Sequence, residues 1–137
     1  MLSYWKPDRV LLDPCCGSGT IAIEAALIAK NIAPGLMRHF AAEKWDFIDK
    51  ELWKKERREA RLAIKQDFQP KIYGSDINAN AVKMSMENAD NAGVGDCIKF
   101  AQIPFNKLKL PCNYGVCISN PPYAERMGNL NDVERTL

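Results

Sequence analysis

Asn120-Pro121-Pro122-Tyr123 is the segment whose residue types best fit a chemical task. It follows Gly115–Ser119, a short run that predicts a buried strand. The side-chain oxygen of Asn120 and the carbonyl of Pro121 could accept the two N–H bonds of a planar amine, and Tyr123 could stack on the ring that carries this amine. Pro121 and Pro122 fix the backbone that aims the acceptors. A plain turn after a strand is the alternative.

A second motif joins a predicted strand, Arg9–Leu12, to a predicted helix, Ile21–Lys30. It consists of Asp13, Pro14, Cys15, Cys16, Gly17, Ser18, Gly19 and Thr20. Glycines let a ligand approach the backbone, and the start of a helix presents free N–H groups. The segment lacks the Gly-Lys-Ser/Thr of a P-loop and the third glycine of the dinucleotide fingerprint. The acid Asp13 favours a ligand with an ammonium group, and a tight turn without a ligand is the alternative.

A third motif is the acid Asp76, which follows the predicted strand Lys71–Ser75. A helix is predicted from Ala79 to about Ala92, with Asn78 as its cap. An acid at the end of the second strand of a doubly wound sheet commonly binds the hydroxyls of a ribose. Asp76 as a further helix cap is the alternative.

Together the three motifs resemble those of the class I S-adenosylmethionine-dependent methyltransferases. Asp13–Thr20 resembles the cofactor-binding motif of that family, and Asp76 falls where the family has its ribose-binding acid. Asn120–Tyr123 matches the [Asn/Asp]-Pro-Pro-[Tyr/Phe] of amino-group methyltransferases. The segment Ala33–Trp45 resembles the THUMP-linked bacterial branch, which includes ribosomal RNA guanine-N2 methyltransferases and proteins often labelled N6-adenine-specific DNA methylases.

The resemblance implies a Rossmann-like α/β fold, a doubly wound parallel sheet with helices on both faces. About four strands are expected, in the order third, second, first, fourth. S-adenosylmethionine is the implied cofactor, with Asp13 near its ammonium group, Asp76 at its ribose and Ile77 beside Asp76. The predicted third strand, 97–101, leads to Gln102, where the family usually has an acid that binds adenine. Gln102 could act there as a substitute acceptor, and binding of the adenine by backbone and apolar contacts is the alternative.

The resemblance covers only part of the catalytic domain of that family. The family's sheet has seven strands, and this branch adds a THUMP domain, whereas residues 1–137 run from just before the first strand to just after the fourth. We therefore expect a partial catalytic domain. It should be a weak enzyme by itself, with an uncovered edge at the fourth strand.

Residues 31–70 are expected to form an insertion, because far more than the usual ~20 residues separate the glycine turn from Asp76. From Lys50 to Lys71 there are eight cations and four acids. This stretch predicts a helix. Four apolar residues are available to face the core, namely Leu52, Trp53, Ala60 and Ile64. Its charges fit a solvated face or, alternatively, a surface that follows a nucleic-acid backbone.

Composition fits one globular domain, with 47% hydrophobic and 26% charged residues in 137. No apolar run is long enough to span a membrane, and no signal-peptide pattern is present. The five cysteines form no Cys-x-x-Cys, and His39 is the only histidine, so neither a zinc site nor cysteine catalysis is expected. Cys97 and Cys117 are predicted to be core residues. Reduced thiols in the cytoplasm are the simplest interpretation.

The motifs predict methyl transfer to an exocyclic amino group of a nucleobase. The branch resemblance favours guanine N2 in ribosomal RNA, which makes ribosomal RNA the expected partner. Three alternatives stay open: adenine N6 in DNA, glutamine N5 in protein, and a fragment that binds cofactor or RNA without catalysis.

Overall fold

The computed structural model describes residues 3–109 and 112–121. Its sheet has four parallel strands, β1 (Leu11–Asp13), β2 (Ile72–Asp76), β3 (Ile98–Gln102) and β4 (Val116–Cys117). Their order is β3-β2-β1-β4, which confirms the order predicted from the resemblance. In this order β1 lies between β2 and β4, so the carboxyl ends of all three strands lie at one edge of the sheet.

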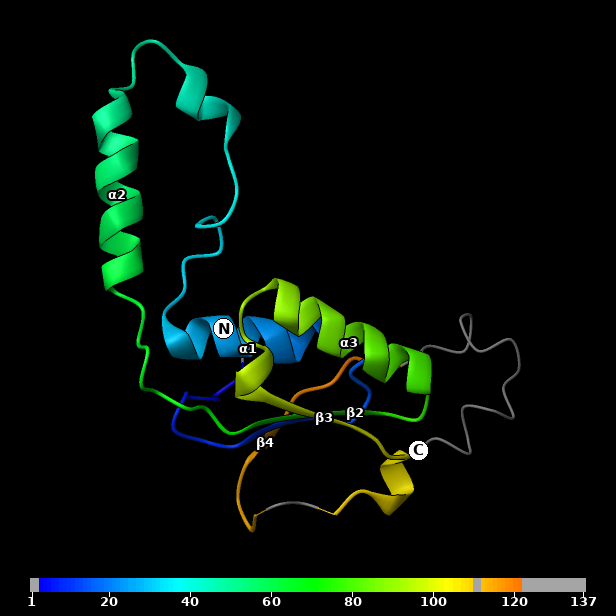
Figure 1. Cartoon of the computed structure of the whole chain (residues 1–137). Helices are drawn as coiled ribbons and strands as arrows, with labels where there is room; N and C mark the ends of the chain where they lie inside the picture. Colours follow the sequence, from blue (N-terminus) through cyan, green and yellow to red (C-terminus); the bar gives the residue numbers. More distant parts are fainter. Residues whose placement is uncertain (1–2, 110–111, 122–137) are drawn as a thin grey trace.

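Helices α1 (Thr20–Lys30) and α3 (Ala79–Asn91) lie together on one face of the sheet (Figure 1). Among the described residues these are the two α-helices that pack on the sheet, and both lie on the same face. The reason is topological. The crossovers β1–α1–β2 and β2–α3–β3 step in the same direction across the sheet, and right-handed crossovers then place both helices on one side. The expected helices of the other face are not tested by the described residues, because most of the chain after β4 lies outside them.

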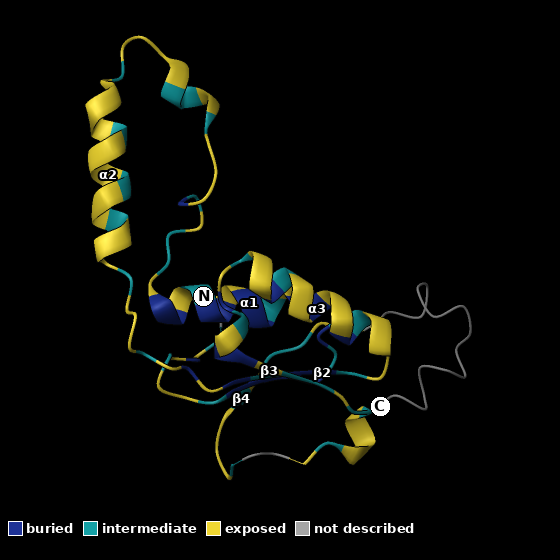
Figure 2. Ribbon diagram, viewed as in Figure 1, coloured by how far each residue is buried: buried dark blue, intermediate teal, exposed yellow. Residues whose placement is uncertain are grey.

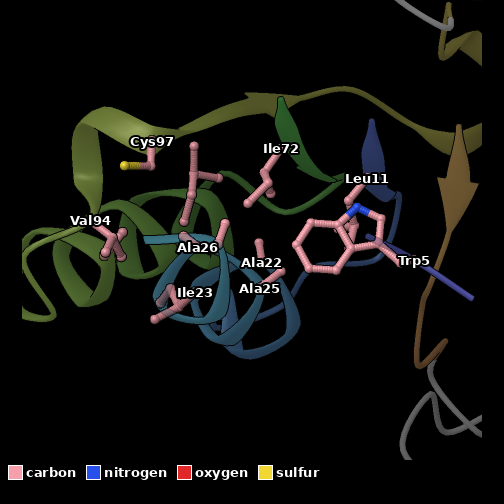
Figure 3. Packing of buried hydrophobic residues seen from close by; sticks show 12 residues of the cluster. Trp5, Leu11, Ala22, Ile23, Ala25, Ala26, Ile72, Val94 and Cys97 are labelled. Carbon is pink, nitrogen blue, oxygen red and sulfur yellow. The ribbon is translucent and has the colours of Figure 1, made fainter. Parts of the chain in front are cut away.

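The core lies between this face of the sheet and α1. Ala22, Ala26 and Ala29 of α1 have exposed fractions of 0%, and Leu11 and Ile72 from the two central strands have 1%. Figure 3 shows Ala22, Ala26, Leu11 and Ile72 within this cluster. Alanine is a strong helix former, and its short side chain lets a helix approach a sheet closely. The alanines of α1 therefore favour the helix and permit its tight packing.

Residues 31–65 project from the sheet as an arm that contains the short helix η1 (Ala41–Lys44) and α2 (Lys50–Leu62) (Figure 1). None of the residues of α2 is buried, so the expectation that this helix faces the core is wrong. Trp53 instead stacks on Phe40 within the arm, with ring centroids 6.0 Å apart. Trp53 thus has a local partner, which the sequence pattern cannot distinguish from packing against the sheet, whereas Leu52 and Leu62 of α2 are exposed.

Two further short helices connect the strands, η2 (Gly95–Cys97) and η3 (Phe105–Lys107). Cys97 is buried, as predicted, with an exposed fraction of 4%. Cys117 is exposed, contrary to prediction. The described residues pair β4 with β1 alone, so Cys117 lies at an edge of the described sheet. No helix in the described part of the chain is long and apolar enough to cross a membrane.

The cap of α3 gives a prediction about stability. The side chain of Asn78 accepts a hydrogen bond from the backbone N–H of Asn80 at 2.9 Å, and Asp49 caps α2 in the same way at Glu51. Because α3 packs on the sheet and α2 buries nothing, Asn78→Ala should cost about 1 kcal/mol of unfolding free energy. The matched variant Asp49→Ala should leave the urea midpoint of the core nearly unchanged. Equal shifts in the two midpoints would contradict the independence of the arm.

Candidate functional site

The glycine turn after β1 is built on two residues in the left-handed region, Gly17 (φ 54°) and Gly19 (φ 84°). A Cβ on Gly19 would lie 2.8 Å from the Cβ of Ser85 on α3, so glycine is required there for packing. A Cβ on Gly17 would meet no atom within 4 Å. Gly17 therefore has no packing reason for its missing side chain, and its backbone faces open space that a ligand can occupy.

Asp76 joins the end of β2 to this turn. Its Oδ2 accepts a hydrogen bond from the backbone N–H of Gly17 at 3.0 Å, and its Oδ1 accepts one from the N–H of Asn78 at 2.9 Å. An ionised carboxylate has about four lone-pair sites, and these two bonds use one on each oxygen. The half-buried carboxylate keeps acceptor capacity for a second pair of donors, such as the hydroxyls of a ribose.

Asp13 lies beneath the turn, with an exposed fraction of 1%. Its Oδ1 accepts hydrogen bonds from the hydroxyl of Ser119 at 2.8 Å and from the N–H of Cys15 at 3.3 Å. Burial raises the pKa of Asp13, and the hydrogen bonds from Ser119 and Cys15 oppose this rise. The carboxylate is thus held in place by protein donors under the position where the sequence predicts an ammonium group.

The hydrogen bond from Ser119 to Asp13 brings the segment after β4 to the glycine turn. Asp13 and Ser119 are 106 residues apart in the chain, and Asn120 and Pro121 follow Ser119 directly. Both Asn120 and Pro121 are exposed, so their acceptors lie at the surface of the site. Pro122 and Tyr123 lie outside the described residues, and their predicted roles remain predictions.

Ile77 and Gln102 lie beside Asp76 at the ends of β2 and β3. The side-chain Nε2 of Gln102 donates to the carbonyl of Ile77 at 3.1 Å, and the N–H of Ile103 donates to the carbonyl of Asp76 at 3.1 Å. Ile77 is 68% exposed, which leaves an apolar side chain at the surface next to the carboxylate. Because its nitrogen is bound, Gln102 offers its oxygen to an incoming donor.

Two contacts of the site have no signal in the sequence. The Nδ2 of Asn88 on α3 donates to the carbonyl of Ser18 at 2.9 Å, across 70 residues of chain. Ser119, whose hydroxyl binds Asp13, reads only as the end of a strand. The spacing of these two residues in the sequence does not predict either contact. Both hydrogen bonds are seen only in the folded chain.

The cysteines of the turn are poor nucleophiles. Burial raises the pKa of Cys16 to about 11, and it also raises the pKa of Cys15. Both side chains are therefore thiols at neutral pH, and a thiol is far less reactive than a thiolate. In the described part of the chain no group of three or more His, Cys, Asp or Glu residues is placed to hold a metal ion.

An open hollow of about 970 Å³ lies beside β1 and β4, away from these groups. Its lining includes Val10, Leu12 and Tyr114, but none of Gly17, Asp76 or Asn120. The hollow thus lacks the groups that converge at the carboxyl ends of the strands. The site at the sheet edge is the better candidate because its donors and acceptors meet there.

The buried carboxylate gives a prediction about pH. In Asp13→Asn the amide oxygen can still accept from Ser119 and Cys15, but the buried charge is gone. Folding disfavours the charged form of Asp13. The wild type therefore gains stability as the pH falls through the raised pKa of Asp13 toward its ordinary value of 3.8. The stability of Asp13→Asn relative to the wild type should therefore be greatest near pH 7 and decline on acidification. Urea unfolding across this range measures it, and a pH-independent difference would contradict the raised pKa.

The whole chain, residues 1–137, matches the family model described as RMKL-like, methyltransferase domain. It is 47% identical over 134 residues to the "Putative RNA methyltransferase YpsC" of Bacillus subtilis (strain 168), covering 98% of this chain and 35% of that protein. It is 46% identical over 136 residues to the "Ribosomal RNA large subunit methyltransferase K/L" of Shewanella amazonensis (strain ATCC BAA-1098 / SB2B). That match covers 96% of this chain and 19% of the relative.

Among solved structures, the chain is similar to SMU.472, described as "a putative methyltransferase complexed with SAH". The TM-score is 0.92 at 41% sequence identity, and the match covers 98% of this chain and 36% of that one. The chain thus spans about a third or less of the length of these relatives.

Proposed function

Because the chain belongs to the family of RMKL-like methyltransferase domains, we propose that it binds S-adenosylmethionine at the carboxyl ends of its strands. The methyl group goes to an exocyclic amino group of a nucleobase, guanine N2 in ribosomal RNA. The observation that carries this proposal is the hydrogen bond between Asp13 and Ser119, which brings the glycine turn to the segment that holds Asn120. One motif suits a cofactor and the other suits an amine.

The residues at the sheet edge fit this cofactor. The open space beside Gly17 would accept its methionine end, the carboxylate of Asp13 would lie near its ammonium group, and Asp76 would bind its ribose. The exposed side chain of Ile77 and the oxygen of Gln102 would hold its adenine. The backbone between these points is supplied by the rest of the turn, Pro14, Cys15, Ser18, Gly19 and Thr20. When bound, S-adenosylmethionine supplies an electrophilic methyl group.

Asn120 and Pro121 orient the acceptor amine. Each offers an oxygen to one N–H of the amine, and these bonds localise the nitrogen lone pair toward the methyl group. As the nitrogen–methyl bond formed, the sulfur–methyl bond of the cofactor would break and S-adenosylhomocysteine would leave. The nitrogen would then be cationic and would lose its acidic proton to water. A strong base is therefore unnecessary, and the contribution of these residues is orientation. Pro122 fixes the backbone of this segment, and Tyr123 stacks on the base.

The names of the relatives support RNA as the substrate, since one is named a "Putative RNA methyltransferase" and the other a "Ribosomal RNA large subunit methyltransferase". Guanine N2 rests on the resemblance of residues 33–45 to the THUMP-linked branch. An unpaired base also avoids most of the cost of leaving a helix stack. A ribosomal RNA substrate places the protein in the cytoplasm.

Gly17 gives a test of the cofactor site with a matched control. Gly17 and Gly93 both have positive φ, 54° and 73°, and a Cβ on either would meet no atom within 4 Å. Replacement by alanine should cost each variant a similar ~1–2 kcal/mol of stability. Only Gly17→Ala should weaken binding of S-adenosylhomocysteine in calorimetric titration, because its methyl group enters the ligand space. Equal affinities in the two variants would place the cofactor elsewhere.

Asn120 gives a test of the chemistry in the full-length protein that carries this sequence. Asn120→Ala should leave cofactor affinity nearly intact and lower turnover by about 10²-fold or more, and Asn120→Asp should be milder because an acceptor remains. Near-normal turnover of Asn120→Ala would refute the amine-orienting role.

The substrate is identified by transfer of a tritiated methyl group to total RNA and genomic DNA from a deletion strain, followed by nucleoside mass analysis. N2-methylguanosine in ribosomal RNA is expected. Label found only as N6-methyladenine in DNA would refute the RNA substrate, and label in neither nucleic acid would point to protein glutamine. Absence of transfer with intact cofactor binding would favour a non-catalytic role.

A further inference from the structure

The arm is ordered by its own contacts and contributes little to the core. The guanidinium of Arg57 on α2 donates to the carbonyls of Leu36 at 2.8 Å and Arg38 at 2.6 Å, and it pairs with the carboxylate of Glu43. These bonds join α2 to the irregular segment that precedes it in the arm. Figure 2 shows most of the arm as exposed. The arm is therefore exposed and is also held by internal hydrogen bonds, so it presents a surface of fixed shape.

The tip of the arm carries two exposed aromatic side chains. The rings of Trp45 and Phe47 stack with centroids 5.5 Å apart and an interplanar angle of 27°. Trp45 is 51% exposed and Phe47 is 82% exposed. Water contact with two large apolar rings is unfavourable, so their exposure in an ordered segment indicates a binding role. Flat aromatic surfaces of this kind bind unpaired bases by stacking.

A stripe of cations runs along α2 from the tip. Lys50, Lys54, Arg58 and Arg61 are spaced by four, four and three residues, so they lie on one side of the helix, and all four are exposed. With a rise of 1.5 Å per residue the stripe is about 16 Å long. Lys54 pairs with Glu51 at 2.6 Å, but an exposed pair of this kind is weak and can exchange for a phosphate.

We propose that the arm binds an unpaired stretch of RNA, with bases stacked at Trp45 and Phe47 and the backbone along the cation stripe. This proposal rests on the proposed function, since the RNA is the substrate strand. The combination of exposed aromatic rings and a line of cations matches single-stranded nucleic acid. A paired duplex hides the faces of its bases, and an acidic protein surface would leave the rings without a flat partner. The arm thus supplies affinity at a distance from the site of methyl transfer.

Two arm variants and one control test this surface. The stripe variant is K50Q/K54Q/R58Q/R61Q, the tip variant is W45L/F47L, and the matched control removes four exposed lysines elsewhere, K6Q/K71Q/K83Q/K99Q. Circular dichroism and S-adenosylhomocysteine affinity verify that each variant is folded. Fluorescence anisotropy then measures the binding of a labelled mixed-sequence oligoribonucleotide of twelve nucleotides at several salt concentrations.

The stripe variant should bind the RNA at least tenfold more weakly, with the slope of log K against log salt reduced by about 3, and the control should change both much less. The tip variant should bind about 5- to 100-fold more weakly with an unchanged slope. A duplex of the same length should compete poorly.

Equal RNA binding by the arm variants and the wild type would overturn the proposal, as would no RNA binding by the wild type or equal competition by the duplex. A failure of the proposed function is a separate result: RNA binding that depends on the arm, but no methyl transfer to RNA by the full-length protein, would refute the RNA substrate alone.

Discussion

The close approach of α1 to the sheet and to α3 is the constraint on which the candidate site depends. Ala22, Ala26 and Ala29 have no exposed surface, and Gly19 lies so near Ser85 that a Cβ would fall 2.8 Å from that side chain. This packing fixes where the helix begins, and so it fixes the turn that precedes it. The N–H of Gly17 then meets Asp76 at 3.0 Å. A bulkier face on α1 would raise the helix and separate this donor from its acceptor.

Two carboxylates lie close together at the edge of the sheet, and the protein stabilises each with N–H or O–H donors. Burial raises the pKa of Asp13, and the nearby carboxylate of Asp76 raises it slightly further, because two negative charges close together repel each other. A cationic ligand relieves this repulsion, so the arrangement suits an ammonium group. In the proposed site the charge that lowers the stability of the free protein would also provide the affinity for the ammonium group, a trade-off that is common at binding sites. In the proposed function the neutral acceptors of Asn120 and Pro121 have a separate task, the orientation of the amine.

The arm is attached so that its direction is set by the core. The ammonium group of the buried Lys30, at the end of α1, donates to the carbonyl of Gln66 at 2.7 Å. The side-chain Nδ2 of Asn31 donates to the carbonyl of Ala63 at 3.0 Å. Both legs of the arm thus begin at the end of one rigid helix. Its outer part is held by Arg57 and by the stack of Phe40 on Trp53. A surface at the tip can therefore keep a constant position relative to the glycine turn.

Local patterns in the sequence determined the strands, helices α1 and α3, the cap at Asn78 and the glycine turn, because each depends on neighbours within a few residues. The strand order followed from the resemblance, and the structure confirms it. Only tertiary structure decided the exposure of Cys117, the direction of α2, and the bonds of Asp13 to Ser119 and of Asn88 to Ser18. Apolar spacing shows that a side chain has a partner but not which one, and hydrogen bonds across 70 to 106 residues of chain are set by packing that no local pattern encodes.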